Sequence, residues 1–542
     1  MMRLTRAVLA AAAIASAVLT EARADDYADL LALFQSWRAT ETPARLDGAP
    51  DYTRAGLAKR RAAVATLRDR LDAMDVGDWS TAQQIDYAIV RAEMNGFTFY
   101  LDVLKPWSRD PAFYKQVWTY QSDTPSHEGP VNHALIELWT YAFPLSPEAQ
   151  DKLATDLRTV APLLAQARGN LTGNARDLWV AGAKTMETQS ADLAALRERL
   201  ENPSIPLLAA LTQAQGATAE FARWLKAQAP QKDGPSGIGK DNYTWMLQNV
   251  HLVPMTWEDE VALLRRELKR AHASLRLEEH RNRNLPPLEP VATPEAYEER
   301  ALDRVDKYVA FMTDNAIVPP ADYLAPALLE RIGAFVPAEK RNFFHQAMHR
   351  EPMTLWTHFY HWWDLALMNA APHESPVRRG PLLYNIWDSR AEGVATAMEE
   401  MALHAGLYDD NPRAREIVWI MQAQRAARGL ASLYAHADEM TMAEASAFHV
   451  KWTPRGWMKP NLDLLGFEQQ LYLRQPGYGT SYVTGKALIE ELFADRMRQR
   501  LEEAGADYPP SAFFAELDAA GVIPVSLIWW ELTGEAAPAA TE

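Results

Sequence analysis

Histidine and carboxylate side chains are concentrated between His345 and Glu400, among tryptophans and other aromatic residues. The residues of this stretch that could bind a metal are His345, His349, His358, His361, Asp364, His373, Glu374, Glu392, Glu399 and Glu400. Imidazole and carboxylate groups are ligands that a divalent ion such as zinc takes in proteins. Because the sequence has no cysteine, His, Asp and Glu are the good ligands available, and a cysteine nucleophile is excluded. The pattern predicts a metal site.

The sequence contains no His-Glu-x-x-His motif, and the pair that comes nearest to it is His345 and His349. These two histidines have the spacing of a zinc-binding helix, but Gln346 stands where such a motif carries its catalytic glutamate. Glutamine cannot take a proton from water. We therefore interpret this pair as buried, hydrogen-bonded histidines on a helix over 341–350.

The next predicted helix carries His358, His361 and Asp364 at intervals of three residues, so each side chain is a neighbour of the next. After a loop rich in proline and arginine, a further helix is predicted over 384–404, with Glu392 near its start and Glu399 two turns later. A pair of ligands on one helix with a glutamate from a following helix is a common way to build a zinc site. This segment is the stronger metal candidate.

Three later segments support a family assignment. They are Glu392-Gly393-Val394-Ala395, an arginine-rich helix at 425–428 with His436 further on, and the run from Arg474 to Lys486. In order and approximate spacing they resemble the bacterial proteins grouped as domain of unknown function 885, which are similar to helical zinc carboxypeptidases. The resemblance extends over nearly the whole chain after residue 24. It implies an all-α array of many helices around a deep central cleft.

Aligned on its first histidine, the family's His-Glu-x-x-Pro-Gly-His segment falls on residues 358–364. Phe359 then stands in place of the glutamate, and Asp364 in place of the second histidine. The resemblance implies a zinc ion bound by His358, by Asp364 or His361, and by Glu392. With Phe359 in the glutamate position another carboxylate would have to transfer the proton. The candidates are Glu374, Glu399 and Glu351.

The segment from Arg474 to Gly479 is predicted to be a turn that leads into a helix over 480–500. Free N–H groups at a helix start beside an arginine would suit a substrate carboxylate, which makes Arg474, Gly477 and Tyr478 candidate binding residues. A plain helix-entry turn explains the glycines equally well.

The family resemblance adds two catalytic candidates and leaves one aromatic residue open. By resemblance, Tyr482 would donate a hydrogen bond to a developing oxyanion, and His436 would be a further catalytic residue. Trp457, in the loop over 452–457, either lines the same cleft or packs at the surface.

The rest of the chain reads as helical scaffold, rich in Ala, Leu, Glu and Arg, with Val and Ile scattered along it. From Thr256 onward, for example, apolar residues such as Val261, Leu264 and Leu268 recur at helical spacing. Prolines and glycines over 230–241 indicate a linker. It would divide one unit over 25–542 into helical subdomains at 25–229 and 242–542, the second carrying the site.

Residues 1–24 have the pattern of an export signal. Arg3 and Arg6 precede an apolar run from Val8 to Leu19, and Ala22-Arg23-Ala24 forms a small-x-small cleavage site. The apolar run is shorter than the ~20 residues of a membrane-spanning helix, and no other segment reaches that length. We expect a periplasmic or secreted protein with no membrane span.

The formal net charge of −16 becomes about −18 once the three arginines and one glutamate of residues 1–24 are removed. Because an acidic surface repels phosphate backbones and anionic membranes, we expect no nucleic-acid partner and instead a small-molecule or short-peptide substrate. The leading hypothesis is an exported metal-dependent hydrolase of peptides or other amides. The alternatives are an inactive member that binds a peptide or aromatic ligand in the cleft, and a changed reaction on a non-peptide substrate.

Overall fold

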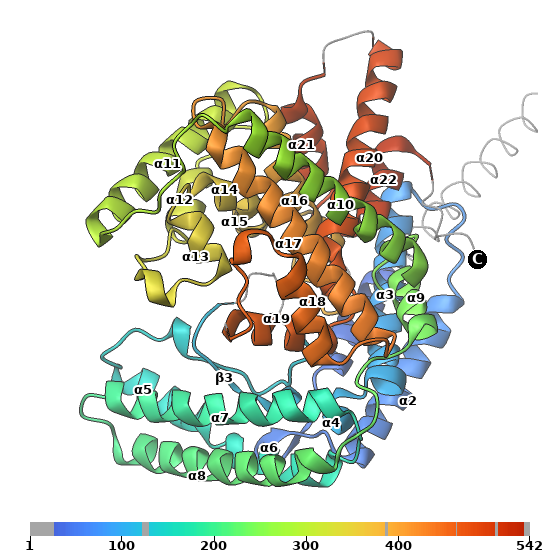
Figure 1. Ribbon diagram of the computed structural model, residues 1–542. Helices are drawn as coiled ribbons and strands as arrows, with labels where there is room; N and C mark the ends of the chain where they lie inside the picture. The colour runs from blue at the N-terminus through green and yellow to red at the C-terminus, as the bar shows by residue number, and fades with distance from the viewer. Residues whose placement is uncertain (1–26, 122–128, 385–387, 462, 505–507, 536–542) are drawn as a thin grey trace, which may run out of the picture.

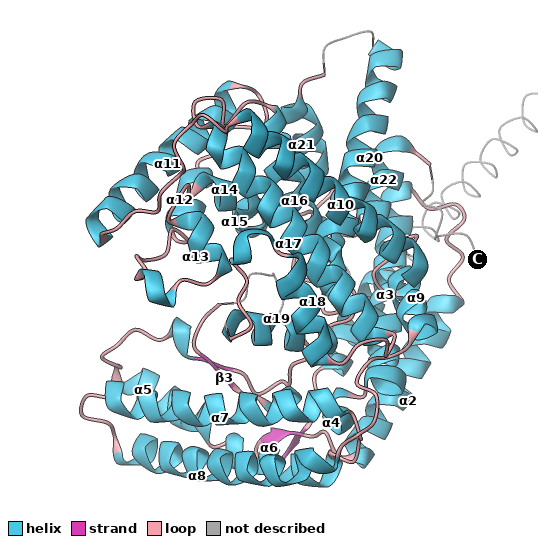
Figure 2. Ribbon diagram, in the orientation of Figure 1, coloured by secondary structure: helices cyan, strands magenta, loops and turns pink. Residues whose placement is uncertain are grey.

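The computed structural model describes residues 27–121, 129–384, 388–461, 463–504 and 508–535. Regular structure in these residues is almost entirely helical (Figure 2), which confirms the predicted all-α fold. The strands are two-residue pieces, with β1 (Arg45–Leu46) antiparallel to β2 (Ala49–Pro50) and β3 (Val117–Trp118) parallel to β4 (Ile136–Glu137). The predicted signal peptide lies outside the described residues.

The first half of the chain forms a layer of helices at the bottom of Figure 1 together with helices that pack on the second half. Its helices are 27–41, α2 (Arg54–Asp72), α3 (Thr81–Phe99), α4 (Pro106–Arg109), α5 (Pro147–Leu157), α6 (Val160–Asn170), α7 (Arg176–Arg199) and α8 (Ile205–Gln228). α7 and α8 pack along each other, and α5 and α6 pack on α8. These four helices share one apolar core, whereas α2 and α3 bury their side chains with the second half.

The second half surrounds two central helices. Its main elements are α9 (Lys240–Asn249), α10 (Trp257–Arg281), α11 (Pro294–Asp314), α12 (Leu324–Leu329), α13 (Phe343–Met348), α14 (Met353–Trp356), the 3₁₀ turn η6 (Thr357–Phe359), α15 (Tyr360–Ala370), α16 (Asp388–His404), α17 (Pro412–His436), α18 (Met442–Trp452), α19 (Asp463–Arg474), α20 (Tyr478–Ala504), α21 (Pro510–Ala519) and α22 (Val525–Thr533). α16 packs along α20, and α10 runs beside α17 (Figure 1). α16 and α17 are buried over nearly their whole length, as expected for helices covered on every side.

The covering helix α10 forms as its sequence predicts. A capping box between Thr256 and Asp259 satisfies the first backbone N–H groups of the helix. Val261, Leu264 and Leu268 lie on its buried stripe, which confirms the expected helical spacing. The opposite face is charged and exposed, so α10 acts as a cover over α17.

α16 and α20 touch through their backbones at two glycines. A Cβ atom placed on Gly393 of α16 would lie 2.5 Å from the carbonyl carbon of Gly485 of α20, and one placed on Gly485 would collide with the Ser389 carbonyl oxygen. Only glycine permits so close an approach. The contact fixes α16 against α20 at the level of Glu392, the residue before Gly393.

The segment predicted as a linker, 230–241, is bonded to residues on both sides of it. Gly234 N–H donates to the Asn174 carbonyl at 2.9 Å, and Gly239 N–H donates to the His436 carbonyl at 2.8 Å. The division into two subdomains stays a prediction. Among the helices of the described residues, none combines the length and apolar character needed to cross a membrane.

Candidate metal centre

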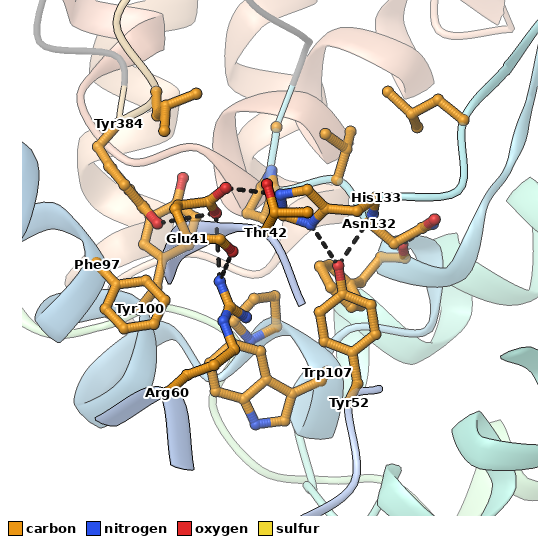
Figure 3. A pocket seen from close by; sticks show the side chains of 17 residues that line it. Glu41, Thr42, Tyr52, Arg60, Phe97, Tyr100, Trp107, Asn132, His133 and Tyr384 are labelled. Atoms are coloured by element: carbon orange, nitrogen blue, oxygen red, sulfur yellow. Dashed lines mark hydrogen bonds and ion pairs between the residues drawn. The ribbon is translucent and has the colours of Figure 1, made fainter. Parts of the chain in front are cut away.

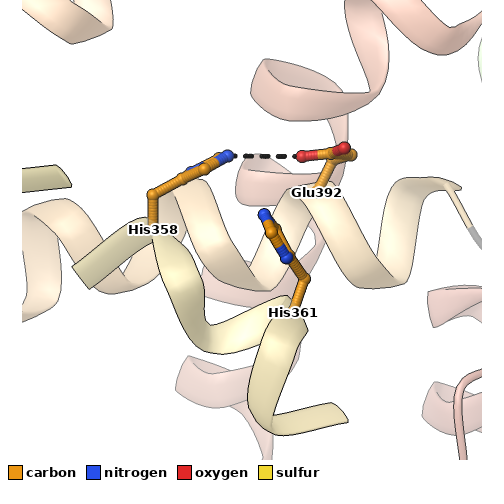
Figure 4. Close-up of side chains that lie close together, drawn as sticks. All are labelled: His358, His361 and Glu392. Carbon is orange, nitrogen blue, oxygen red and sulfur yellow. Dashed lines mark ion pairs between the residues drawn. The ribbon is translucent and has the colours of Figure 1, made fainter. Parts of the chain in front are cut away.

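His358, His361 and Glu392 converge in the interior of the second half (Figure 4). Each can offer one ligand atom such that these atoms all lie within 4.8 Å of one another, and His358 Nε2 is 3.3 Å from Glu392 Oε2. The three residues are 7%, 3% and 1% exposed. They come from η6, α15 and α16, so chain segments more than thirty residues apart meet at this point.

The two histidines are brought to the same side by a change of helix type at Phe359. The sequence predicts one regular helix from His358 onward, whereas the structure has the 3₁₀ turn η6 followed by α15, with Phe359 at ψ 13° between them. Residues three apart nearly eclipse each other in a 3₁₀ turn, while they diverge around an α-helix. The rings of His358 and His361 accordingly lie 5.2 Å apart, centroid to centroid.

Several buried atoms of the cluster lack a hydrogen bond within the described structure. They are Nδ1 of His358, Nδ1 of His361 and Oε2 of Glu392. Burial, reinforced by the charge of Arg425, lowers the pKa of His358 to about 4, and burial lowers the pKa of His361 to about 3. Both imidazoles are therefore neutral at neutral pH, the form that binds metals. Two neutral imidazoles and a carboxylate at this spacing fit a zinc ion.

A second group of side chains surrounds the cluster. Glu399 Oε1 lies 3.1 Å from His358 Nδ1, though not aligned for a hydrogen bond, and 2.5 Å from a guanidinium nitrogen of Arg425. A carboxylate behind a ligating histidine fixes the orientation of its ring. Tyr478 donates its hydroxyl proton to Glu392 Oε1 at 2.7 Å, and so holds that carboxylate in place.

Tyr482 lies between the cluster and its surroundings. Its ring stacks on that of His358 at 5.7 Å and 11°, and its hydroxyl donates to the hydroxyl of Tyr478 at 3.2 Å. The guanidinium of Arg428 covers the ring at 3.9 Å. The predicted oxyanion donor therefore lies directly beside the candidate ligands.

Asp364 is not part of the three-residue cluster. Both of its carboxylate oxygens accept hydrogen bonds from Arg390, each at 3.0 Å, and Arg390 also binds Asp518 at 3.1 Å. Burial raises the pKa of Asp364, and it raises the pKa of Asp518 to about 7. The sequence offered Asp364 and His361 as alternatives, and the structure brings His361 to His358 and Glu392.

Comparison with known proteins gives a family match for the first half of the chain. Residues 38–285 match the family model described as "Bacterial protein of unknown function (DUF885)". The match covers 248 of the 542 residues. The match confirms the family resemblance drawn from the sequence, although the residues that carried that resemblance, 392–486, lie beyond it. The likeness to zinc carboxypeptidases and the deep cleft stay predictions.

Solved structures share the fold of this chain. One is described as "a putative lipoprotein of unknown function from Shewanella oneidensis", with a TM-score of 0.65 and 16% identity over 94% of this chain and 98% of that one. Another, a "putative lipoprotein from Colwellia psychrerythraea", has a TM-score of 0.63 and 12% identity over 94% and 99%. Identities this low establish a common fold alone. No curated protein matches the sequence.

The remaining catalytic candidates lie in other surroundings. Glu374 is exposed in the loop after α15. Glu351 is buried and bound to Arg304 at 2.9 Å. His436, at the end of α17, contacts the Tyr472 carbonyl oxygen through Nε2 at 2.9 Å. The contacts described for these residues do not include the cluster.

Some of the predicted substrate-binding residues contact the cluster, and others have a structural role elsewhere. Tyr478 reaches Glu392, but the Arg474 guanidinium binds Asp110 at 2.6 Å and thereby anchors the turn before α20. Gly477 has φ of 86°, which a helix-entry turn requires of a glycine. Trp457 packs on Phe343, with ring centroids 6.2 Å apart.

Sequence reasoning overlooked Asp388, which lies one helical turn before Glu392 on α16. It is fully buried, its Oδ2 accepts a hydrogen bond from Gln475 at 3.2 Å, and its Oδ1 has no partner among the described residues. Burial raises the pKa of Asp388 well above its usual range and so favours its protonated form. The four-residue spacing to Glu392 was the available signal.

A separate cavity of about 400 Å³ is lined in part by residues 129–133 (Figure 3). Its aromatic lining comprises Tyr52, Phe97, Tyr100, Trp107, Phe113 and Tyr384. At its polar end His133 lies 2.6 Å from Glu41 and 2.8 Å from the Tyr52 hydroxyl. Gly129, in the cavity wall, donates its N–H to Gln475 at 2.6 Å, so hydrogen bonds connect this wall to Asp388.

Proposed function

We propose that this protein is a metal-dependent hydrolase of peptides or other amides, and that His358, His361 and Glu392 hold its zinc ion. The observation that carries the proposal is the cluster itself. Three buried groups of the right chemistry converge, and atoms on each lack a hydrogen bond within the described structure. Leaving buried polar atoms unpaired costs free energy, so such a group is expected where a ligand completes it.

When bound, a zinc ion in such a site would lower the pKa of a water molecule and polarise a scissile carbonyl. The surrounding residues have positioning roles. Glu399, itself neutralised by Arg425, would hold the ring of His358, and Tyr478 would fix one oxygen of Glu392 while the other faces His358. In this arrangement Glu399 orients a ligand and is not the proton acceptor that the sequence considered.

Two groups of the chain would handle charge and protons. The Tyr482 hydroxyl, now donating to Tyr478, would turn to donate to the substrate oxygen as negative charge develops there. Burial favours the protonated form of Asp388, which would deliver a proton from Oδ1 to the leaving amine. The proton lost by the attacking water would then return to the Asp388 carboxylate, so that the group ends as it began.

We infer that the protein acts in the cell envelope or outside the cell. The bacterial proteins that share its fold are described as putative lipoproteins, and residues 1–24 have the pattern of an export signal. Periplasmic and secreted locations both agree with these observations. Fractionation of the native host would distinguish them.

A second candidate is an inactive relative that binds a peptide or aromatic ligand. Phe359 in the glutamate position favours it, and so does Arg390, which occupies the carboxylate of Asp364. The separate aromatic cavity would then be the binding site. This candidate needs no metal, which separates it from the first.

The test is the metal content of protein purified without chelator. A hydrolase of the proposed kind retains about one zinc ion per chain, and Glu392→Gln loses it. His404→Gln is the matched control, because His404 lies on the same helix but is exposed. A metal-free wild-type protein whose melting temperature does not respond to zinc would reject the proposal and leave the binding protein.

A further inference from the structure

A second charged cavity lies away from the metal centre, where the start of α17 meets the loop after α18. Its volume is about 250 Å³, and its lining includes Trp457 and the charged residues Glu289, Arg350, Arg413, Glu416 and Arg455. That volume equals roughly eight water molecules, enough for a small solute. Three guanidinium groups around one cavity are unexpected in a chain of net charge −16.

The lining carries two carboxylates, Glu289 and Glu416, against three arginines. Glu416, 1% exposed, accepts from Arg413 at 2.7 Å and also binds Arg455, so a single buried carboxylate serves two guanidinium groups. Arg350 donates to the backbone and side-chain oxygens of Gln346 at 2.9 and 2.8 Å. Glu289, also in the lining, attracts the Arg350 guanidinium, but within the described structure no carboxylate lies within ion-pair distance of it.

The positions of Arg350 and Arg455 are fixed by their surroundings. The guanidinium of Arg350 lies 4.9 Å above the ring of Trp457, a cation–π contact that sets its orientation. Arg455 has a left-handed backbone, with φ of 59°, which is unfavourable for a residue with a side chain. Its guanidinium nevertheless reaches Glu416 and Glu279, so the fold holds this arginine at the cavity despite the backbone strain.

We propose that this cavity is a binding site for a small oxyanion, a phosphate or a carboxylate group, held by Arg350 and Arg455. Guanidinium groups bind both anions through paired hydrogen bonds, and an oxyanion would give Arg350 a direct ion pair. Trp457 forms the flat wall of the site. From the sequence, Trp457 is expected either to line the cleft or to pack at the surface. In this proposal it instead lines the anion site. The site is independent of the proposed hydrolase.

Titration calorimetry with inorganic phosphate and with succinate tests the site, against sodium chloride at equal ionic strength. Phosphate or succinate should bind with a Kd on the order of millimolar or tighter, and Arg350→Gln should weaken binding at least about tenfold. Arg455→Gln should weaken it too, which covers the case that the first variant does not fold. Arg281→Gln removes an exposed guanidinium elsewhere and should bind like the wild type.

The same titration on Glu392→Gln separates this site from the metal centre, because binding there would disappear with the metal while binding at Arg350 would not. Preference for phosphate identifies a phosphorylated ligand, and preference for succinate a carboxylate. If neither anion binds more tightly than chloride, or if Arg350→Gln and Arg455→Gln bind like the wild type, the cavity is not an oxyanion site.

Discussion

Two buried polar clusters lie side by side on α15 and α16 and differ in how their charges are satisfied. In one, Arg390 donates to both oxygens of Asp364 and also to Asp518. In the other, His358, His361 and Glu392 approach one another with nitrogen and oxygen atoms left unpaired in the described structure. The same helices therefore carry one cluster whose carboxylates are compensated and another that is incomplete.

The difference separates a structural from a functional use of buried charge. A compensated ion pair leaves its carboxylates no capacity for a ligand, and removing its cation exposes them to the full cost of burial. Unpaired polar atoms in an incomplete cluster destabilise the free protein, and a ligand that binds them stabilises the folded state. Substitutions in the two clusters should therefore have opposite consequences for the free energy of unfolding.

The largest effect is expected from Arg390→Met. The side chain keeps much of its volume, but Asp364 and Asp518 lose their cation inside the protein, which should cost about 3–5 kcal/mol of unfolding free energy. Denaturant unfolding monitored by circular dichroism measures it. Arg498→Ala is the control, because its ion pair with Glu502 is exposed and should contribute under about 1 kcal/mol. Equal losses in the two variants would contradict the comparison.

Glu392→Gln should act mainly on the response to metal. Zinc at a free concentration about 100 times its Kd adds about 2.7 kcal/mol to a protein that binds it only when folded, and this gain should vanish in the variant. Without metal, the variant should be as stable as the wild type or slightly more so, because a buried charge has been removed. Thermal melts with and without zinc give both numbers. A variant that keeps the full zinc response would remove Glu392 from the ligand set.

The two clusters should also make the free energy of unfolding change with pH in opposite directions. His358 and His361 have folded pKa values of about 4 and 3, below the ordinary histidine value, so the unfolded chain binds more protons and stability rises with pH from about 3 to 6.5. Asp518, with a folded pKa of about 7, binds its proton more tightly when folded, so its contribution falls from about pH 4 to 7.

Two single substitutions separate these slopes. His361→Gln should flatten the rise of stability with pH, and Asp518→Asn should flatten the fall. Metal-free protein unfolded by denaturant at a series of pH values provides the comparison. If Asp518→Asn leaves the dependence between pH 4 and 7 unchanged, the carboxylate does not retain its proton in the folded state.

Tyr482→Phe should have the smallest effect on stability, under about 1 kcal/mol, because only one hydroxyl–hydroxyl contact is lost. Its effect on catalysis should be much larger, a fall in kcat of about 100-fold or more with KM little changed, since the hydroxyl acts on charge that develops in the transition state. Steady-state kinetics on a chromogenic amide measures both constants. Metal content provides the control and should stay at the wild-type value.

Helical periodicity was sufficient to predict the scaffold. Leu264 and Leu268 of α10 follow a stripe that any helix must bury, and its capping box marks the helix start. Such signals are local, so a single sequence contains them. The all-α fold could be predicted for this reason.

The candidate site was harder to predict because its geometry depends on contacts distant in sequence. From spacing alone, Asp364 and His361 are equally good candidates as metal ligands. Arg390, which forms an ion pair with Asp364, lies on another helix. The change to a 3₁₀ turn at Phe359 leaves no pattern in the sequence. Asp388 was overlooked since a lone aspartate at a helix start is usually a solvated residue, and its burial follows from the helices around it.

The contact between Gly393 and Gly485 limits how this protein can change during evolution. Where two helices meet through side chains, a larger residue on one can be accommodated by a smaller residue on the other. Here the backbones already touch, and Glu392 and Tyr482 stand close by on the two helices. A replacement at either glycine has no compensating partner, because no residue is smaller than glycine.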